Sequence, residues 1–397
     1  MGPLGAYPLY LDRAAGPYAW DVDQQRYVDW FNGNCAVTLG HGHPLVRQCI
    51  VDALQTFGAL PSLPTRLEAE VAENLCRVIP CAESIRFVKT GSEACAGAVR
   101  IARMATGRDV IVCAEGQYHG WHDWHCVTKP YHPGVPDILG SLVRTFRWGD
   151  ADSLLAAMGQ DVAAVMVEPA LPSMADPVWL QTLANIAHAH GALVAFDEMI
   201  TGGRLHLGGA QVETGVIPDL GTFGKAYANG HALAFIAGSR ELMRHAWPVS
   251  GTFGAETVGL AACLAVLKIH AQEQPLTRLH RVGQWLIDGF NGIASRLGFV
   301  ARMAGHACRP HIDWQEPDTG RLLMIRSLFQ QELAARGVLT HWGAWNPSAA
   351  HEAQQVGETL TAIDGALTSM AGYLADPDPS THLRGELIQP AFTRPAA

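Results

Sequence analysis

The sequence predicts an α/β protein with a mostly parallel central sheet and helices on both faces. From residue 84 onward, short and continuously apolar segments alternate with segments of helical periodicity. The expected strands are 84–88, 109–113, 162–167 and 192–196, and the helices between them are 93–105 and 177–190. Strands without polar alternation are typical of a parallel sheet that helices cover on both faces.

The flanking segments predict a second, smaller α+β domain formed by both ends of the chain. Residues 5–30 alternate short apolar runs with turns, which is typical of a small antiparallel sheet. Helical periodicity recurs at 276–297, 322–336 and 352–374, with strand-like segments near 298–314. We therefore expect an N-terminal segment 1–44 that packs with the small domain, a large domain 45–272, a small C-terminal domain 273–376 and a tail 377–397.

Composition excludes several classes of protein. With 397 residues and 48% hydrophobic residues, the chain can bury a large core and is not expected to be disordered. The 28 Lys and Arg residues against 37 Asp and Glu residues argue against nucleic-acid binding. No uncharged apolar run approaches the ~18 residues that span a membrane. The nine scattered cysteines suggest free thiols in the cytoplasm, and the 16% charged fraction suggests a surface covered by a second subunit.

The segment after the first strand has the pattern of a phosphate site. Ligands of open parallel sheets bind at the carboxyl ends of the strands. Thr90 and Glu93 fit a capping box that starts a helix, and the backbone N–H groups at Gly91 and Ser92 would be free to receive a phosphate. A helix that is merely capped fits the same pattern.

Two further strand ends carry isolated charges. Asp197 ends an apolar strand, where a carboxylate needs a cationic or hydrogen-bonding partner; a structural ion pair or helix cap is the alternative. Lys225 lies in the otherwise uncharged stretch 220–237, where a lysine can act as a Schiff-base nucleophile; a solvated lysine is the alternative. A phosphate cradle, a buried aspartate and a nucleophilic lysine together fit pyridoxal 5'-phosphate, with Tyr118 as an aromatic face.

Ordered motifs along nearly the whole chain strengthen this interpretation. They lie at residues 21–23, 27–29, 39–44, 91–94, 118–120, 167–169, 196–202, 218–225 and 251–254. In these segments the sequence resembles the class III aminotransferases of fold type I, in particular their glutamate-1-semialdehyde aminomutase-like branch. The resemblance implies a pyridoxal-phosphate enzyme whose active sites lie at the interface of a homodimer.

The resemblance also implies roles for single residues. Lys225 would form the internal aldimine and shuttle a proton, and Asp197 would pair with the pyridinium nitrogen. The remaining cofactor residues would surround the ring and the phosphate: Met199 and Tyr118 on the ring faces, Gly91 and Ser92 at the phosphate, Thr252 at the phosphate of the neighbouring subunit, Glu168 as a supporting carboxylate and His119 as a pocket residue.

Departures from the family's pattern gather near the substrate. Residues 1–8 contain no counterpart of the arginine with which the aminomutases hold their substrate. Residues 170–173, Gly203 and residues 226–231 also differ from the aminomutase pattern. We therefore expect an aminotransferase that moves an amino group from an amino donor to a carbonyl acceptor by a ping-pong mechanism, in specialised-metabolite or amino-sugar metabolism. An aminomutase or racemase is one alternative, and a non-catalytic scaffold of the same fold is another.

Two other features have less specific patterns. His119, His122 and His125 follow a three-residue spacing, but loop histidines that line a pocket explain it better than a metal centre, so we expect no metal. Glu256 follows the motif at 251–254 and is either an amine-recognition carboxylate or a solvated one.

Overall fold

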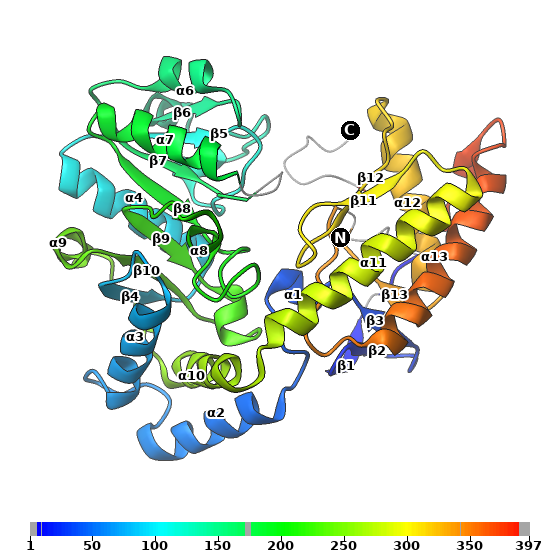
Figure 1. Cartoon of the computed structure of the whole chain (residues 1–397), viewed down its shortest axis with the longest axis horizontal. Helices are drawn as coiled ribbons and strands as arrows, with labels where there is room; N and C mark the ends of the chain where they lie inside the picture. Colours follow the sequence, from blue (N-terminus) through cyan, green and yellow to red (C-terminus); the bar gives the residue numbers. More distant parts are fainter. Residues whose placement is uncertain (1–5, 9, 171–175, 342, 389–397) are drawn as a thin grey trace. The chain divides into compact units, whose positions relative to one another are not determined.

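The computed structural model describes the chain except for residues 1–5, 9, 171–175, 342 and 389–397 (Figure 1). The chain divides into two compact units. One consists of residues Leu45–Gln272, and the other combines Met1–Pro44 with Glu273–Ala397. Within the part of the chain that the structure describes, no helix is long and apolar enough to cross a membrane.

A seven-stranded sheet forms the centre of the unit 45–272. In spatial order its strands are β4 (Ser84–Val88), β10 (Ala234–Gly238), β9 (Leu220–Phe223), β8 (Leu193–Asp197), β7 (Val162–Val167), β5 (Val110–Ala114) and β6 (Val143–Phe146). Only β10 runs antiparallel to its two neighbours. All the other pairs are parallel, so β7, β8 and β9 end at the same edge of the sheet.

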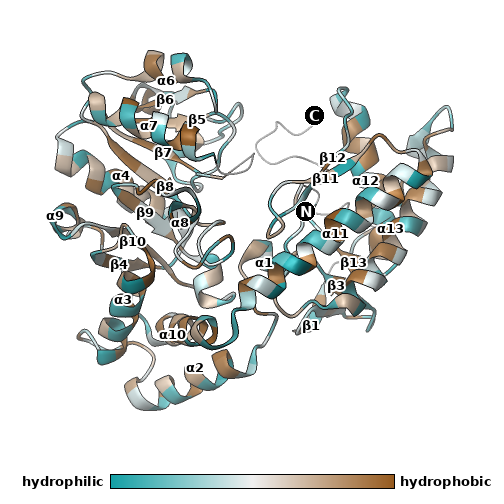
Figure 2. Cartoon of the chain, viewed as in Figure 1, coloured by the Kyte–Doolittle hydropathy of each residue, from teal (hydrophilic) through white to brown (hydrophobic). Residues whose placement is uncertain are grey.

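Successive residues of β5 pack into opposite cores, as the two-residue period of a strand requires. On β5, Ile111 and Cys113 join the core beneath α4 (Gly91–Thr106). Val110 and Val112 join the core on the other face, with residues of α6 (Ala151–Ala157) and α7 (Pro177–Ala189). Figure 2 shows strands such as β7 as mainly hydrophobic. Burial on both faces explains why these strands read as apolar runs.

The remaining elements of this unit surround the sheet. They are α2 (Pro44–Phe57), α3 (Arg66–Val78), α5 (Asp123–Cys126), α8 (Ala210–Thr214), α9 (Arg240–Met243), α10 (Thr257–Glu273) and the short 3-10 helices η1 (Asp137–Leu142), η2 (Lys225–Ala228) and η3 (Arg244–Ala246). Helix α10 is buried along most of its length, which fits its sequence of almost uninterrupted apolar residues.

The second unit packs two small sheets with three long helices. Strands β1 (Leu11–Ala15), β2 (Tyr18–Asp21) and β3 (Arg26–Asp29) form an antiparallel meander, and β13 (Val338–Leu339) joins β3 in parallel. The other elements are β11 (Arg302–Ala304), β12 (His311–Asp313), α1 (Asn32–Cys35), α11 (Pro275–Leu297), α12 (Thr319–Ala335), α13 (Ala353–Tyr373) and η4 (Pro379–His382). The three long helices share one apolar core with β3 and β13.

The predicted fold class is confirmed. The strands at 84–88 and 162–167 have the predicted bounds, and the other predicted strands shift by one residue. The sequence did not predict β6 and β10 and gave no bounds for β9, and β10 makes the sheet mixed. Part of the segment expected as a tail is anchored, because the Ile388 N–H donates to Ser327 Oγ at 3.0 Å, whereas 389–397 lie outside the described residues.

Candidate active site

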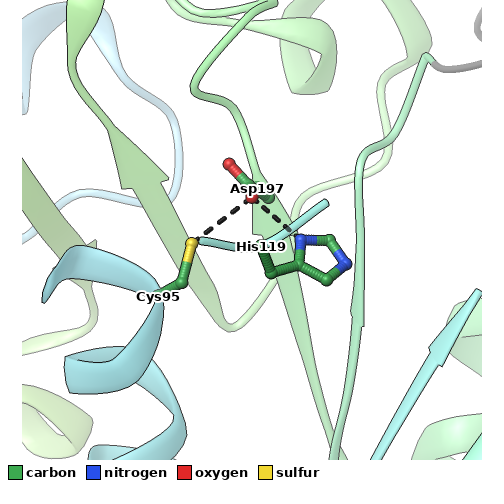
Figure 3. A group of neighbouring side chains, drawn as sticks. All are labelled: Cys95, His119 and Asp197. Atoms are coloured by element: carbon green, nitrogen blue, oxygen red, sulfur yellow. Dashed lines mark hydrogen bonds and ion pairs between the residues drawn. The ribbon is translucent and has the colours of Figure 1, made fainter. Parts of the chain in front are cut away.

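A buried carboxylate marks the carboxyl edge of the large sheet. Asp197 ends β8 and is only 4% exposed. Its Oδ2 accepts from His119 Nδ1 at 2.9 Å and from the Cys95 thiol at 3.3 Å, while its Oδ1 accepts from the Met199 N–H at 3.1 Å. Figure 3 shows Cys95 reaching the carboxylate from α4 and His119 reaching it from a loop. The Thr222 hydroxyl of β9 also donates to Oδ1, at 3.5 Å, so donors from α4, the His119 loop and β9 join the local Met199 N–H in holding this carboxylate in place.

The loop that carries His119 is tied to the end of β7. The Gln117 side chain bonds the Glu168 backbone in both directions, at 3.0 and 2.8 Å, and the Tyr118 N–H donates to Glu168 Oε2 at 3.1 Å. Glu168 thus orients the segment that presents His119 to Asp197. Tyr118 is 46% exposed, and its ring makes an edge contact with His125.

The predicted phosphate cradle has the geometry of a capped helix start. Glu93 N–H donates to Thr90 Oγ1 at 3.2 Å, and Thr90 N–H donates back to Glu93 Oε2 at 2.9 Å, which completes the capping box. Close packing surrounds the first turn. A Cβ on Gly120, whose φ is +100°, would lie 2.6 Å from Ser92 Cα, and a Cβ on Gly91 would lie 3.0 Å from Met199 Sδ.

Lys225 follows β9, the strand next to the one that ends at Asp197. Thr222 of β9 is the register partner of Asp197, so Lys225 lies just beyond the same sheet edge. Lys225 is half-buried with φ +47°, a left-handed backbone that is uncommon for a residue other than glycine. A Cβ on the preceding Gly224 would lie 3.0 Å from Met199 Sδ. Met199 is therefore packed against both Gly91 and the lysine-bearing loop.

Thr252 lies elsewhere in this unit, in the exposed turn before α10. It lines a recess of about 250 Å³ together with Lys89, Arg100 and His122. The structure thus brings Asp197, His119, Met199, Gly91 and the Lys225 loop to one edge, and it places Thr252 in a separate turn.

Burial determines the charge state of several groups around Asp197. It raises the pKa of the Cys95 thiol well above its ordinary value, and the nearby Asp197 adds to this, so the thiol stays protonated and donates. Burial lowers the pKa of His125 to about 2, with His119 as the next cause. It also raises the pKa of Glu198, against the effect of donors at Thr201, Ala210 and Gln211.

The sequence profile of the family described as Aminotransferase class-III matches residues 4–343. The chain belongs to the class III aminotransferase family. It is 35% identical over 401 residues to a glutamate-1-semialdehyde 2,1-aminomutase of Symbiobacterium thermophilum, covering 93% of this chain and 92% of that protein.

Solved structures show the same fold. The FumI protein of Sphingopyxis sp. MTA144, solved as the internal aldimine form with pyridoxal phosphate, has a TM-score of 0.87 at 28% identity, over 93% of this chain and 91% of that one. An omega-transaminase of Sphaerobacter thermophilus has a TM-score of 0.86 at 26% identity, over 93% of each chain. This member of the family is therefore a pyridoxal-phosphate-dependent enzyme of fold type I.

The residues at the sheet edge fit that cofactor. A buried anion with four donors suits a protonated ring nitrogen, and the capped helix start offers backbone N–H groups to a phosphate. Sequence reasoning missed Cys95, Thr222 and Lys89. Cys95 lies three residues after Ser92, one helical turn further along α4, so helical spacing was the available signal. For Thr222, the signal was its place in the strand that ends before Lys225.

The structure also brings together three groups of a type that can bind metals. Ligand atoms of Cys95, His119 and Asp197 lie within 4.8 Å of one another. The thiol and the imidazole both point at the carboxylate and donate to it, so they form a hydrogen-bonded group.

Glu256 is not solvated, because it is paired with Lys89 at 2.6 Å.

Proposed function

We propose that this enzyme moves an amino group from an amino donor to a carbonyl acceptor in two half-reactions at one site. The observation that carries the proposal is the buried Asp197 carboxylate, held by His119 and Cys95 at the edge beyond which Lys225 lies. A single site that alternately takes donor and acceptor gives ping-pong kinetics.

Each residue of the site has a proposed task. The Lys225 amine would hold the cofactor covalently, and once an incoming amino donor has replaced it there, the freed amine would move a proton at the reacting carbon. Asp197 keeps the ring nitrogen protonated, and the N–H groups at Gly91 and Ser92 bind the phosphate. Met199 and Tyr118 flank the ring. When bound, pyridoxal phosphate supplies an electron-accepting ring.

We also infer a homodimer in which Thr252 contributes to the phosphate site of the partner. Thr252 lies in an exposed turn, and the neighbouring Phe253 is 60% exposed, so this turn offers an apolar side chain that a partner subunit could cover. The low charged fraction of 16% supports the same inference. An active site completed by a second chain would explain why Thr252 lies apart from Asp197.

An intramolecular aminomutase is the second candidate, because the relative that is 35% identical carries that name. Against it stand the sequence departures at Gly203 and at 226–231, whereas the departure at 171–173 lies outside the described residues. Action on specialised metabolites or amino sugars remains a prediction.

A half-reaction screen separates the two candidates. The loaded enzyme is mixed with single amines without any acceptor, and the carbonyl product and pyridoxamine phosphate are quantified. We expect one equivalent of each per active site, followed by turnover when a carbonyl acceptor is added. Product formed from one substrate with no dependence on an external donor would instead identify an aminomutase. Lys225→Ala should still bind the cofactor non-covalently but lose turnover, and near-normal turnover in this variant would refute the mechanism.

A further inference from the structure

Lys89 occupies a junction between three segments of the large unit. It follows β4 directly and precedes the capping residue Thr90, and its own N–H donates to Glu93 Oε2 at 2.8 Å. Its ammonium donates to the Ala232 carbonyl at 2.8 Å and to Glu256 Oε1 at 2.6 Å. The side chain is only 16% exposed, so this is not an ordinary solvated lysine.

Glu256 links Lys89 to the start of α10. Its two carboxylate oxygens accept from the N–H groups of Val258 at 2.8 Å and Gly259 at 2.6 Å. The Glu256 N–H in turn donates to the Phe253 carbonyl at 3.2 Å, within the turn that carries Thr252. Because a carboxylate at a helix start is also favoured by the helix dipole, Glu256 is held in one orientation toward Lys89.

Two glycines show how closely these segments pack. A Cβ on Gly259 would lie 2.9 Å from Glu256 Oε1 and 3.0 Å from Lys89 Nζ. A Cβ on Gly254 would lie 2.7 Å from the Phe87 carbonyl, on the strand that ends just before Lys89. The turn 251–254 is therefore packed directly on the end of β4, and the ion pair lies beside that contact.

The third contact leads to the lysine-bearing loop. Ala232 lies between η2, which begins at Lys225, and β10, which pairs with both β4 and β9. Through the Ala232 carbonyl, the Lys89 ammonium fixes the far end of this loop to β4. Removing one partner of such a half-buried ion pair leaves the other charge buried and unpaired. The pair therefore holds both side chains, and the segments that carry them, in one arrangement.

We infer that Lys89 is a positioning residue. Through Glu256 and Ala232 it fixes the phosphate cradle, the lysine-bearing loop and the Thr252 turn in their positions relative to one another. The inference rests on the proposed function, because that function assigns the phosphate cradle and the lysine-bearing loop to the cofactor of this chain and the Thr252 turn to the cofactor of the partner. Lys89 need not touch the cofactor itself.

The test is the dissociation constant of pyridoxal phosphate for the cofactor-free, full-length protein, measured by fluorescence titration alongside the unfolding temperature without cofactor. The variants are Lys89→Met, Lys89→Arg, Glu256→Gln and the double variant Lys89→Met/Glu256→Gln. Arg144→Met is the matched control, because Arg144 and Asp161 form an ion pair of the same 2.6 Å length away from these segments.

We expect both single variants, Lys89→Met and Glu256→Gln, to weaken cofactor binding by about tenfold or more. The double variant should bind no more weakly than Lys89→Met, because both changes break one unit, and Lys89→Arg should recover much of the affinity. The control should bind like the wild type.

Cofactor affinity within twofold of the wild type in Lys89→Met and Glu256→Gln would overturn the inference, even if both variants unfold at lower temperature. Weak binding in Lys89→Met with unchanged binding in Glu256→Gln would also overturn it, since Lys89 would then contact the cofactor directly. If Lys89→Met does not fold, Glu256→Gln against the control decides. None of these outcomes bears on donor-dependent turnover, which tests the proposed function separately.

Discussion

Asp197→Asn separates the charge of the carboxylate from its place in the fold. The substitution keeps the shape of the side chain and removes its negative charge. The amide can keep an oxygen toward the Met199 N–H and present its NH₂ group to His119 Nδ1. His119 Nε2 has no partner among the described residues, so the ring can move its proton to Nε2 and accept at Nδ1.

This rearrangement limits the structural cost. Charge-assisted hydrogen bonds become neutral ones, which lowers the free energy of unfolding by about 1–2 kcal/mol. For a unit of this size, that corresponds to roughly 2–8 °C in the unfolding temperature of the cofactor-free protein. Nothing replaces the anion that faces the ring nitrogen, so turnover should fall by on the order of 10²–10³-fold.

The assay compares kcat for donor-dependent turnover with the unfolding temperature. Asp161→Asn is the control, since Asp161 forms an ion pair with Arg144 at the surface that is worth at most about 1 kcal/mol. Turnover of Asp197→Asn near the wild-type value would refute the assignment of Asp197 to the ring nitrogen. Failure of this variant to fold would refute the proton shift on His119.

Three further substitutions test the surroundings of this carboxylate. Gly120→Ala should lower the free energy of unfolding in urea by about 1–3 kcal/mol more than Gly116→Ala, because both have positive φ but only a Cβ on Gly120 meets other atoms; equal losses would contradict this. Burial lowers the pKa of His125 to about 2, so below about pH 6.5 the unfolded chain takes up a proton at this residue while the folded chain does not. The free energy of unfolding should therefore decrease as the pH is lowered from about 6.5, by up to ~1.4 kcal/mol per pH unit. His125→Phe should make this decrease shallower, and an unchanged slope would contradict the assignment to His125. Cys95→Ala should weaken cofactor binding more than Cys95→Ser, since serine keeps a donor toward Asp197; the same affinity in both variants would show that the thiol does not hold the carboxylate.

The sequence was sufficient for features that depend on local pattern. Continuous apolar runs predicted the parallel strands, because a strand buried on both faces leaves no polar alternation. The capping box at Thr90 and Glu93 predicted the start of α4, and both reciprocal hydrogen bonds are present. The position of Asp197 at the end of a strand was also predictable, because it directly follows an apolar run in the sequence.

Features that depend on strand order could not be predicted in this way. Cys95 reaches Asp197 across 102 residues of sequence and Lys89 reaches Glu256 across 167. Both contacts depend on β10 lying between β4 and β9, an arrangement that reverses one strand and has no local signal. Glu256 therefore read as an amine-recognition or solvated carboxylate, whereas its charge is engaged by Lys89.

The same strand order explains how Lys89 can position segments of the proposed site that lie far from it in the sequence. Because β10 pairs with both β4 and β9, one strand joins the end of β4 to the loop after Lys225. The segments at Gly91 and at Lys225 therefore share one rigid support, but the turn at Thr252 belongs to neither strand. The ion pair of Lys89 with Glu256 is the contact that adds this turn to the support. In the proposed dimer the Thr252 turn serves the partner's cofactor, so this link fixes one chain's contribution to the second site relative to its own site. Such a link matters because a small misplacement of a group that positions a reactant can cost much of the rate.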